Sequence, residues 1–204
     1  MTAKIKLNAA SGGGSFSLQA PSSSANTMVM TLPDTADGTI LTTTNPKAGN
    51  IIQVVKNQKT DVFSSTTINA WTDITGATVT ITPSATSNKV YGIFSFAYGM
   101  DAFHSVMNFK IVRSSTVVSD VAAASGGAGT FQSTTYGLRA MHDTNGGGFQ
   151  TLTFLDSPSS TSAITYQLQY YAVQTATYYL NRGENDSTSY GRGASTFTAM
   201  EVAA

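Results

Sequence analysis

The segment ITYQLQYYA, from Ile164 to Ala172, decides the fold class of this chain. Apolar or aromatic side chains occupy every second position, and threonine, glutamine or tyrosine occupies the positions between them. Because successive side chains of a β-strand point to opposite faces, this alternation predicts a strand with one face in a core and the other in water. We therefore build the expected fold outward from this strand.

The same pattern recurs on both sides of this segment. Val90, Phe94, Phe96 and Tyr98 share one face of a second predicted strand, in which Gly92 leaves room for a close neighbour. Further predicted strands are Met107 to Ile111, Ile51 to Val55, Thr78 to Thr82, Leu152 to Leu155, Tyr178 to Leu180 and Phe197 to Val202. Roughly eight short strands between turn signals predict an all-β sandwich, with a jelly roll as the expected arrangement.

The composition excludes several classes of function. Charged residues make up 11% of the 204 residues, against about 25% in ordinary soluble domains. The 11 basic and 11 acidic side chains balance and are scattered, so we expect no nucleic-acid partner. The absence of cysteine excludes disulfides and thiolate metal sites. We also expect no export signal and no membrane insertion, because no apolar run of sufficient length occurs.

The first 45 residues differ in character from the rest. Glycine-rich and serine-rich stretches separate very short apolar segments that cannot bury enough surface to fold alone. Either this arm is a disordered tether or identical neighbours complete its strands, and the apolar alternation favours the second reading. We therefore predict a stalk or anchor arm over 1–45 and a head over 46–204, joined near Pro46. The expected anchor residues are Lys4, Ile5, Leu7, Phe16 and Leu18.

Candidate catalytic and metal-binding residues are few. His104 and His142 are the two imidazoles, and they could converge on an ion, also as a ring of three in a trimer. Two ordinary surface or interface histidines are the simpler interpretation, and the question stays open. The glycine clusters lack a P-loop ending, no G-x-S-x-G elbow occurs and the acids stand alone in turns. We therefore predict no enzyme and no cofactor.

Aromatic side chains are the most informative class, with nine Tyr, ten Phe and one Trp. In the adjacent pairs Tyr170-Tyr171 and Tyr178-Tyr179, one ring is expected in the core and the other exposed or at a subunit interface. Exposed rings can stack on sugars, although an interface is the more frequent role. The candidate glycan or interface residues are Trp71, Tyr171, Tyr179, Tyr190 and Arg192.

The C-terminal segment carries a family resemblance. Arg182 and Arg192 are placed to pair with Glu184, Asp186 or a neighbouring chain. The sequence TYYLNRGENDS followed by SYGRGASTFTAMEV resembles the C-terminal signature of virion structural proteins of tailed bacteriophages, often tail-fibre-like and from marine or cyanobacterial phages. INAWTDITGATVTITPSATSNKVYGIFSF looks like the first hairpin of that family's knob, and NFKIVRSSTVVSD and FLDSPSSTSAITYQLQYYAV are similar to its middle strands. The opening segment from Lys4 to Thr43 resembles its stalk.

This resemblance implies a homotrimer whose jelly-roll heads are related in shape to the C1q and tumour-necrosis-factor trimers, without catalytic residues. It implies a fibre or knob on the surface of a phage particle, on tail or capsid, for attachment to the host. The expected partners are other copies of the chain, further virion proteins through the arm, and a host-surface glycan or protein. The alternatives are a decoration or cement protein that reinforces the capsid, or a carbohydrate-binding module.

Overall fold

The computed structural model of the chain describes most of its length. The described residues are 4–8, 11–19, 23, 25, 46–102, 105–119, 138–139, 147–183, 186 and 191–204. They form strands β1 to β13 with no helix among them, which confirms the all-β prediction. A membrane-crossing helix is accordingly not found in this described part. The chain divides into two compact units, Met1–Ile40 and Leu41–Ala204.

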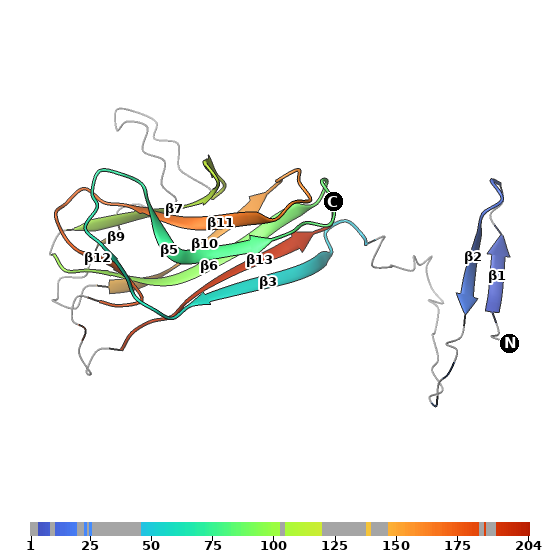
Figure 1. Ribbon diagram of the computed structural model, residues 1–204, viewed down its shortest axis with the longest axis horizontal. Helices are drawn as coiled ribbons and strands as arrows, with labels where there is room; N and C mark the ends of the chain where they lie inside the picture. Colours follow the sequence, from blue (N-terminus) through green and yellow to red (C-terminus); the bar gives the residue numbers. More distant parts are fainter. Residues whose placement is uncertain are drawn as a thin grey trace, which may run out of the picture. The chain divides into compact units, whose positions relative to one another are not determined.

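The second unit, the head, consists of two antiparallel sheets in two layers (Figure 1). The six-stranded sheet has the order β3-β13-β6-β12-β4, with β10 also pairing with β6. Its strands are β3 (Ile51–Lys59), β4 (Phe63–Ser65), β6 (Lys89–Met100), β10 (Gly147–Asp156), β12 (Tyr178–Leu180) and β13 (Ser195–Val202). The five-stranded sheet has the order β5-β11-β7-β8, with β9 also pairing with β7. Its strands are β5 (Thr72–Ile81), β7 (Val106–Arg113), β8 (Thr116–Val117), β9 (Leu138–Arg139) and β11 (Ile164–Tyr171).

The core lies between these sheets and is rich in aromatic rings. Phe96 of β6 packs on Phe109 of β7 with ring centroids 4.7 Å apart, and Phe154 of β10 packs on Tyr166 of β11 at 4.6 Å. The predicted inward positions of β11 are buried, from Ile164 at 8% exposure to Tyr166, Leu168 and Tyr170 at 0%. The alternation therefore gave the correct inward face, and the predicted strand segments are all present as strands.

The close neighbour expected at Gly92 is the ring of Phe154. A Cβ atom at Gly92 would lie 2.0 Å from Cε1 of Phe154, closer than any real contact. Gly92 stands opposite Phe154 on one side and Ala199 on the other. The missing side chain thus lets the Phe154 ring lie directly against the backbone of β6, as the sequence predicted.

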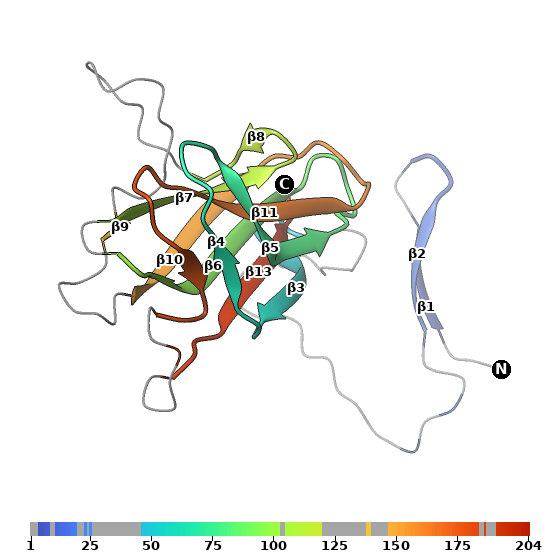
Figure 2. The same cartoon turned by 60° about the vertical axis from the view of Figure 1, so that its left-hand side comes forward.

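One expectation from the family resemblance is wrong. The segment 68–96 contains β5 and β6, which the resemblance assigned to one hairpin, but these strands lie in different sheets. The reason is that β6 has neighbours on both edges, with β10 on one and β13 and β12 on the other, while β5 pairs with β11. Both views of the head place β3 beside β13 and β10 beside β6 (Figure 2). The two-sheet architecture is established, and jelly-roll winding remains a prediction.

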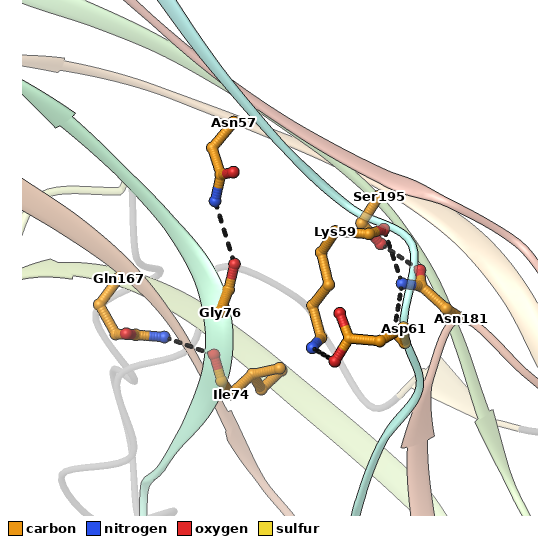
Figure 3. A network of polar contacts seen from close by, with 8 residues as sticks. All are labelled: Asn57, Lys59, Asp61, Ile74, Gly76, Gln167, Asn181 and Ser195. Atoms are coloured by element: carbon orange, nitrogen blue, oxygen red, sulfur yellow. Dashed lines mark hydrogen bonds and ion pairs between the residues drawn. The ribbon is translucent and has the colours of Figure 1, made fainter.

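A buried amide ties the ends of three strands of the six-stranded sheet together. Asn181 follows β12, has a φ of 67° and is fully buried. Its amide nitrogen donates to the carbonyl oxygens of Lys59 and Asp61, each at 2.9 Å, and its oxygen accepts from the Ser195 hydroxyl at 2.6 Å (Figure 3). These bonds satisfy a polar group that would otherwise be costly to bury.

The first unit contains a single antiparallel pair among its described residues, β1 (Lys4–Asn8) and β2 (Ser15–Gln19). Gly12 and Gly13, with φ of 85° and 71°, lie between them. All five predicted anchor residues fall in this pair, with Ile5 opposite Leu18 and Leu7 opposite Phe16. Leu7 is 58% exposed. Two strands are marginally stable alone in water, and completion of this arm by neighbouring copies stays a prediction.

Candidate functional site

A groove runs along the outer face of the five-stranded sheet. Thr165, Gln167 and Gln169 are the outward positions of β11, between the buried residues of the core. They line a cavity of about 490 Å³ together with Asp73 of β5 and Arg113 of β7. The remaining lining residues are Val112, Ser114, Pro158, Ser160, Ala163 and Ile164. This polar groove has the size of a small-ligand site.

At one end of the polar groove the lining is fixed by cross-strand contacts. Gln169 stands opposite Asp73 of β5 and Lys110 of β7. Its amide nitrogen donates to Oδ1 of Asp73 at 2.8 Å. Tyr171, the next outward position of β11, contacts the ring of Trp71 with centroids 5.5 Å apart. The structure therefore brings together two residues that the sequence singled out separately.

A cation completes this aromatic pair. The Lys110 ammonium nitrogen lies 4.1 Å from the centroid of the Trp71 ring, a cation–π geometry. Burial lowers the pKa of Lys110, because the charged ammonium loses water. One face of the indole is thus covered by the ammonium. Lys110 could not be identified from the sequence, because its position beside Trp71 depends on strand register.

An irregularity of β5 lies beside Gln167 of the polar groove. The residues from Ile74 to Ala77 bulge opposite β11, where the pairing shifts between Gln167 and Gln169. Gly76 in this bulge has a φ of 79°. The Gln167 amide donates to the carbonyl oxygen of Ile74 at 2.9 Å, and Asn57 donates to that of Gly76 at 3.2 Å (Figure 3). Bulges of this kind re-aim neighbouring side chains, and Gln167 holds this one in place.

A second group of predicted residues forms an ion-pair cluster. Nε of Arg192 donates to Oδ1 of Asp186 at 2.8 Å, and Arg182 approaches the same carboxylate at 3.7 Å. The hydrogen bond from Arg192 lowers the pKa of Asp186. The predicted pairing of both arginines with Asp186 is therefore confirmed, whereas Glu184 lies outside the described residues.

The exposure expected for Tyr179 is wrong. The residue is 9% exposed, and its neighbour Tyr178 is fully buried. The reason is that the Arg182 guanidinium covers the Tyr179 ring at 4.3 Å from the centroid. In the other pair, Tyr170 is fully buried, as expected for the core ring, and Tyr171 is half-buried.

The outer face of the six-stranded sheet carries apolar side chains that the sequence did not reveal. By register, Leu155 of β10, Tyr91 of β6, Met200 of β13 and Val54 of β3 stand side by side. We name these four residues the apolar row. Leu155 is 58% and Val54 57% exposed. These outward positions were hidden in the sequence because they belong to different strands whose neighbours were unknown.

Three candidate residues cannot be placed. His104, His142 and Tyr190 lie outside the described residues. Within the ranges that are described, no group of three or more His, Cys, Asp or Glu could hold a metal ion. The prediction that the chain is not an enzyme stays a prediction.

Comparison with known proteins yields distant structural likeness alone. No protein-family model matches the sequence, and no match was found among curated proteins. A structure of the infectious bursal disease virus Gx strain is similar at 15% identity and a TM-score of 0.36, over 97% of this chain and 46% of that one. The crystal structure of a VP2 subviral particle of infectious bursal disease virus is similar at 12% identity and 0.35, over 92% and 47%. The chain thus spans about half the length of these solved structures.

Proposed function

We propose that this chain is a structural subunit of a virus particle, a homotrimeric fibre or knob displayed at the particle surface for attachment to the host. The observation that carries the proposal is the apolar row on the outer face of the six-stranded sheet. Contiguous exposed apolar side chains mark protein interaction sites. The sequence resemblance to tailed-phage virion proteins is what supports a location on a particle and a threefold symmetry in this proposal.

The proposed occupant of this face is the same face of neighbouring copies. The next row across the sheet reads Thr153, Ile93, Thr198 and Lys56, so one charged side chain accompanies three uncharged ones. Such a surface offers little complement to a charged partner, and its natural complement is another apolar, hydroxyl-rich sheet face. Adjacent strands lie about 4.8 Å apart, so the apolar row is about 14 Å long. A stable interface of about 800 Å² per partner also takes in the flanking rows.

The arm supports the same proposal. The hairpin of β1 and β2 leaves Leu7 58% exposed, and two strands are marginal without further burial. Contacts of this hairpin with other copies or other particle proteins would supply the missing burial. We therefore assign the arm to attachment within the particle and the head to display.

Light scattering of the intact chain tests the proposal. We expect three times the monomer mass of 21.3 kDa. Val54→Glu places a charge at the end of the apolar row and should shift the protein toward monomer, because burying an unpaired carboxylate costs several kcal/mol. Thr75→Glu is the matched control, since it adds the same charge at an exposed position of the other sheet and should leave the trimer intact.

Two results would contradict the proposal. An intact chain that stays monomeric at the highest soluble concentration rules out self-association. A trimer that is indifferent to both Val54→Glu and Leu155→Glu shows that another surface makes the contact. A monomer that nevertheless binds emptied phage capsids would favour the decoration or cement alternative.

A further inference from the structure

We propose that the polar groove binds a short neutral oligosaccharide. As a host-surface ligand this sugar rests on the proposed display of the chain on a particle, whereas the binding itself is a property of the head. The proposal stands on the shape of the polar groove, on the hydrogen-bonding groups fixed in it, on the aromatic pair at its end and on its charge balance.

The shape suits an extended ligand. The cavity of about 490 Å³ follows β11 past three successive outward positions, Thr165, Gln167 and Gln169. Alternate residues of a strand are about 6.8 Å apart, so these positions and Tyr171 span about 20 Å. A single sugar would fill one part of this length, and a chain of several sugars would fill it all.

The polar groups are preorganised for hydroxyl recognition. The bond from Gln169 to Asp73 fixes both planar groups and leaves the second carboxylate oxygen of Asp73 to accept from a ligand hydroxyl. Gln167 is fixed by its bonds to the bulge at Ile74 and Ala77, so its carbonyl oxygen has a set direction. Ordered groups of this kind lose little entropy when a ligand binds. Neighbouring fixed acceptors match the neighbouring hydroxyls of a sugar ring.

The aromatic pair lies where the row of polar groups ends. Tyr171 follows Gln169 at the next outward position and contacts Trp71 at 5.5 Å. Because the Lys110 ammonium covers the indole at 4.1 Å, Tyr171 is the ring we assign to stacking against a sugar. Its half-buried position leaves part of the ring in solvent.

The charges select a neutral ligand. Asp73 and Arg113 are the two charged residues in the lining. Arg113 is already held by Asp156, with Nε to Oδ2 at 2.7 Å and a second nitrogen to Oδ1 at 3.3 Å. Asp156 is itself anchored by the Tyr166 hydroxyl at 2.9 Å. The guanidinium is therefore matched by its own carboxylate. Lys110 lies across from Gln169, but its ammonium is directed onto the Trp71 ring and is not part of the lining, so a phosphate or other strong anion in the polar groove would meet the carboxylate of Asp73.

Trp71 makes the test direct, because it is the single tryptophan of the chain. Intact protein is titrated with cellotetraose, maltotetraose, chitotetraose and mannotetraose, with tetragalacturonate as the anionic comparison, and Trp71 emission and calorimetric heat are followed. We expect saturable binding of at least one neutral tetrasaccharide with a dissociation constant below about 1 mM. Gln169→Ala and Tyr171→Ala should each weaken it by about tenfold or more, measured by calorimetry. Thr151→Ala, on the other sheet, should leave it unchanged.

Each contrary result overturns the proposal. No saturation with any neutral probe rules out the ligand class, and binding of tetragalacturonate alone replaces it with an anionic one. Binding that survives both Gln169→Ala and Tyr171→Ala places the ligand elsewhere. Circular dichroism confirms that each variant is folded. Light scattering on the same samples separates the two proposals. A trimer that binds no sugar contradicts only the sugar-binding proposal, and a monomer that binds sugar contradicts only self-association.

Discussion

Replacing Glu201 by alanine is expected to destabilise the head by about 3 to 5 kcal/mol. The carboxylate is fully buried in β13. Its Oε1 accepts from the Ser84 backbone nitrogen at 2.6 Å, the Ser84 hydroxyl at 2.7 Å and the Asn88 amide at 2.6 Å. Its Oε2 accepts from the Gln53 amide at 2.6 Å. The side chain therefore clamps β13 to β3 and to the connection between β5 and β6.

The magnitude follows from the donors that lose their acceptor. Asn88 is buried, at 6% exposure, so its amide would keep only the longer bond to the Ser84 hydroxyl, at 3.3 Å, and little contact with water. Ser84 is exposed and Gln53 half-buried, so both can turn toward solvent. A buried unsatisfied donor costs about 1 to 3 kcal/mol, and the space left by the removed carboxylate adds to this. Glu201→Gln keeps the volume and one acceptor oxygen, so we expect about 1 to 2 kcal/mol for it.

Thermal unfolding at a fixed protein concentration measures both variants. A change of 1 kcal/mol shifts the melting temperature by about 2 to 4 °C in a domain of this size. Glu201→Ala should therefore melt about 6 to 20 °C below the wild type and Glu201→Gln about 2 to 8 °C below it. A Glu201→Ala protein that melts within about 2 °C of the wild type would refute the clamp.

The same carboxylate makes stability depend on pH. Burial alone would raise the pKa of Glu201, but the hydrogen bonds from Asn88, Gln53 and Ser84 outweigh it and hold the pKa below the ordinary 4.5. The unfolded chain then binds the proton more readily, so the contribution is complete above about pH 4.5 and is lost as the pH falls through the lower folded pKa. Glu201→Gln lacks this titration. Urea midpoints should show the gap between the two proteins narrowing from pH 7 to pH 3, and a constant gap would contradict the argument.

Two further substitutions test the packing of the head. Gly92→Ala should destabilise the head by about 1 to 3 kcal/mol, because the new methyl would meet the Phe154 ring at 2.0 Å. Adding Phe154→Leu to the Gly92→Ala protein should recover part of this loss. Gly191→Ala, with open space around the new methyl, is the matched control in thermal unfolding. Asn181→Asp should cost about 2 to 4 kcal/mol, and more than Asn181→Gly, because a carboxylate would face the carbonyl oxygens of Lys59 and Asp61. Equal urea midpoints for the two Asn181 variants would show that the carbonyl oxygens of Lys59 and Asp61 do not disfavour a carboxylate at this position.

The local part of the fold could be predicted from the sequence because strand alternation is local. The inward residues of β11, such as Tyr166 and Leu168, alternate with polar ones, and this pattern by itself identifies the core face. Gly92 could be interpreted in the same way, since a residue without a side chain on a buried face implies a close neighbour. These predictions need no knowledge of which strands are adjacent.

The rest depends on strand order and register, which no single segment encodes. Trp71 and Tyr171 were both singled out, yet their contact follows from the pairing of β5 with β11, and Lys110 joins them through β7. Tyr179 was expected outside because alternation was applied to a three-residue strand, whereas Arg182, just beyond that strand, folds over its ring. The assignment of β5 and β6 to one hairpin failed for the same reason, since β6 had other partners on both edges.

The outer face of the six-stranded sheet also constrains how the protein can avoid aggregation. With 11% charged residues and no net charge, repulsion between copies is weak, so an uncovered apolar row would favour open-ended association. The row crosses β10, β6, β13 and β3, and therefore reaches from one edge of the sheet to the other. A closed assembly covers the apolar row on every copy. An open arrangement always leaves the apolar row of a terminal copy exposed to solvent. We therefore expect Val54→Glu to yield dispersed monomers, because the added charge replaces the protection that closure otherwise provides.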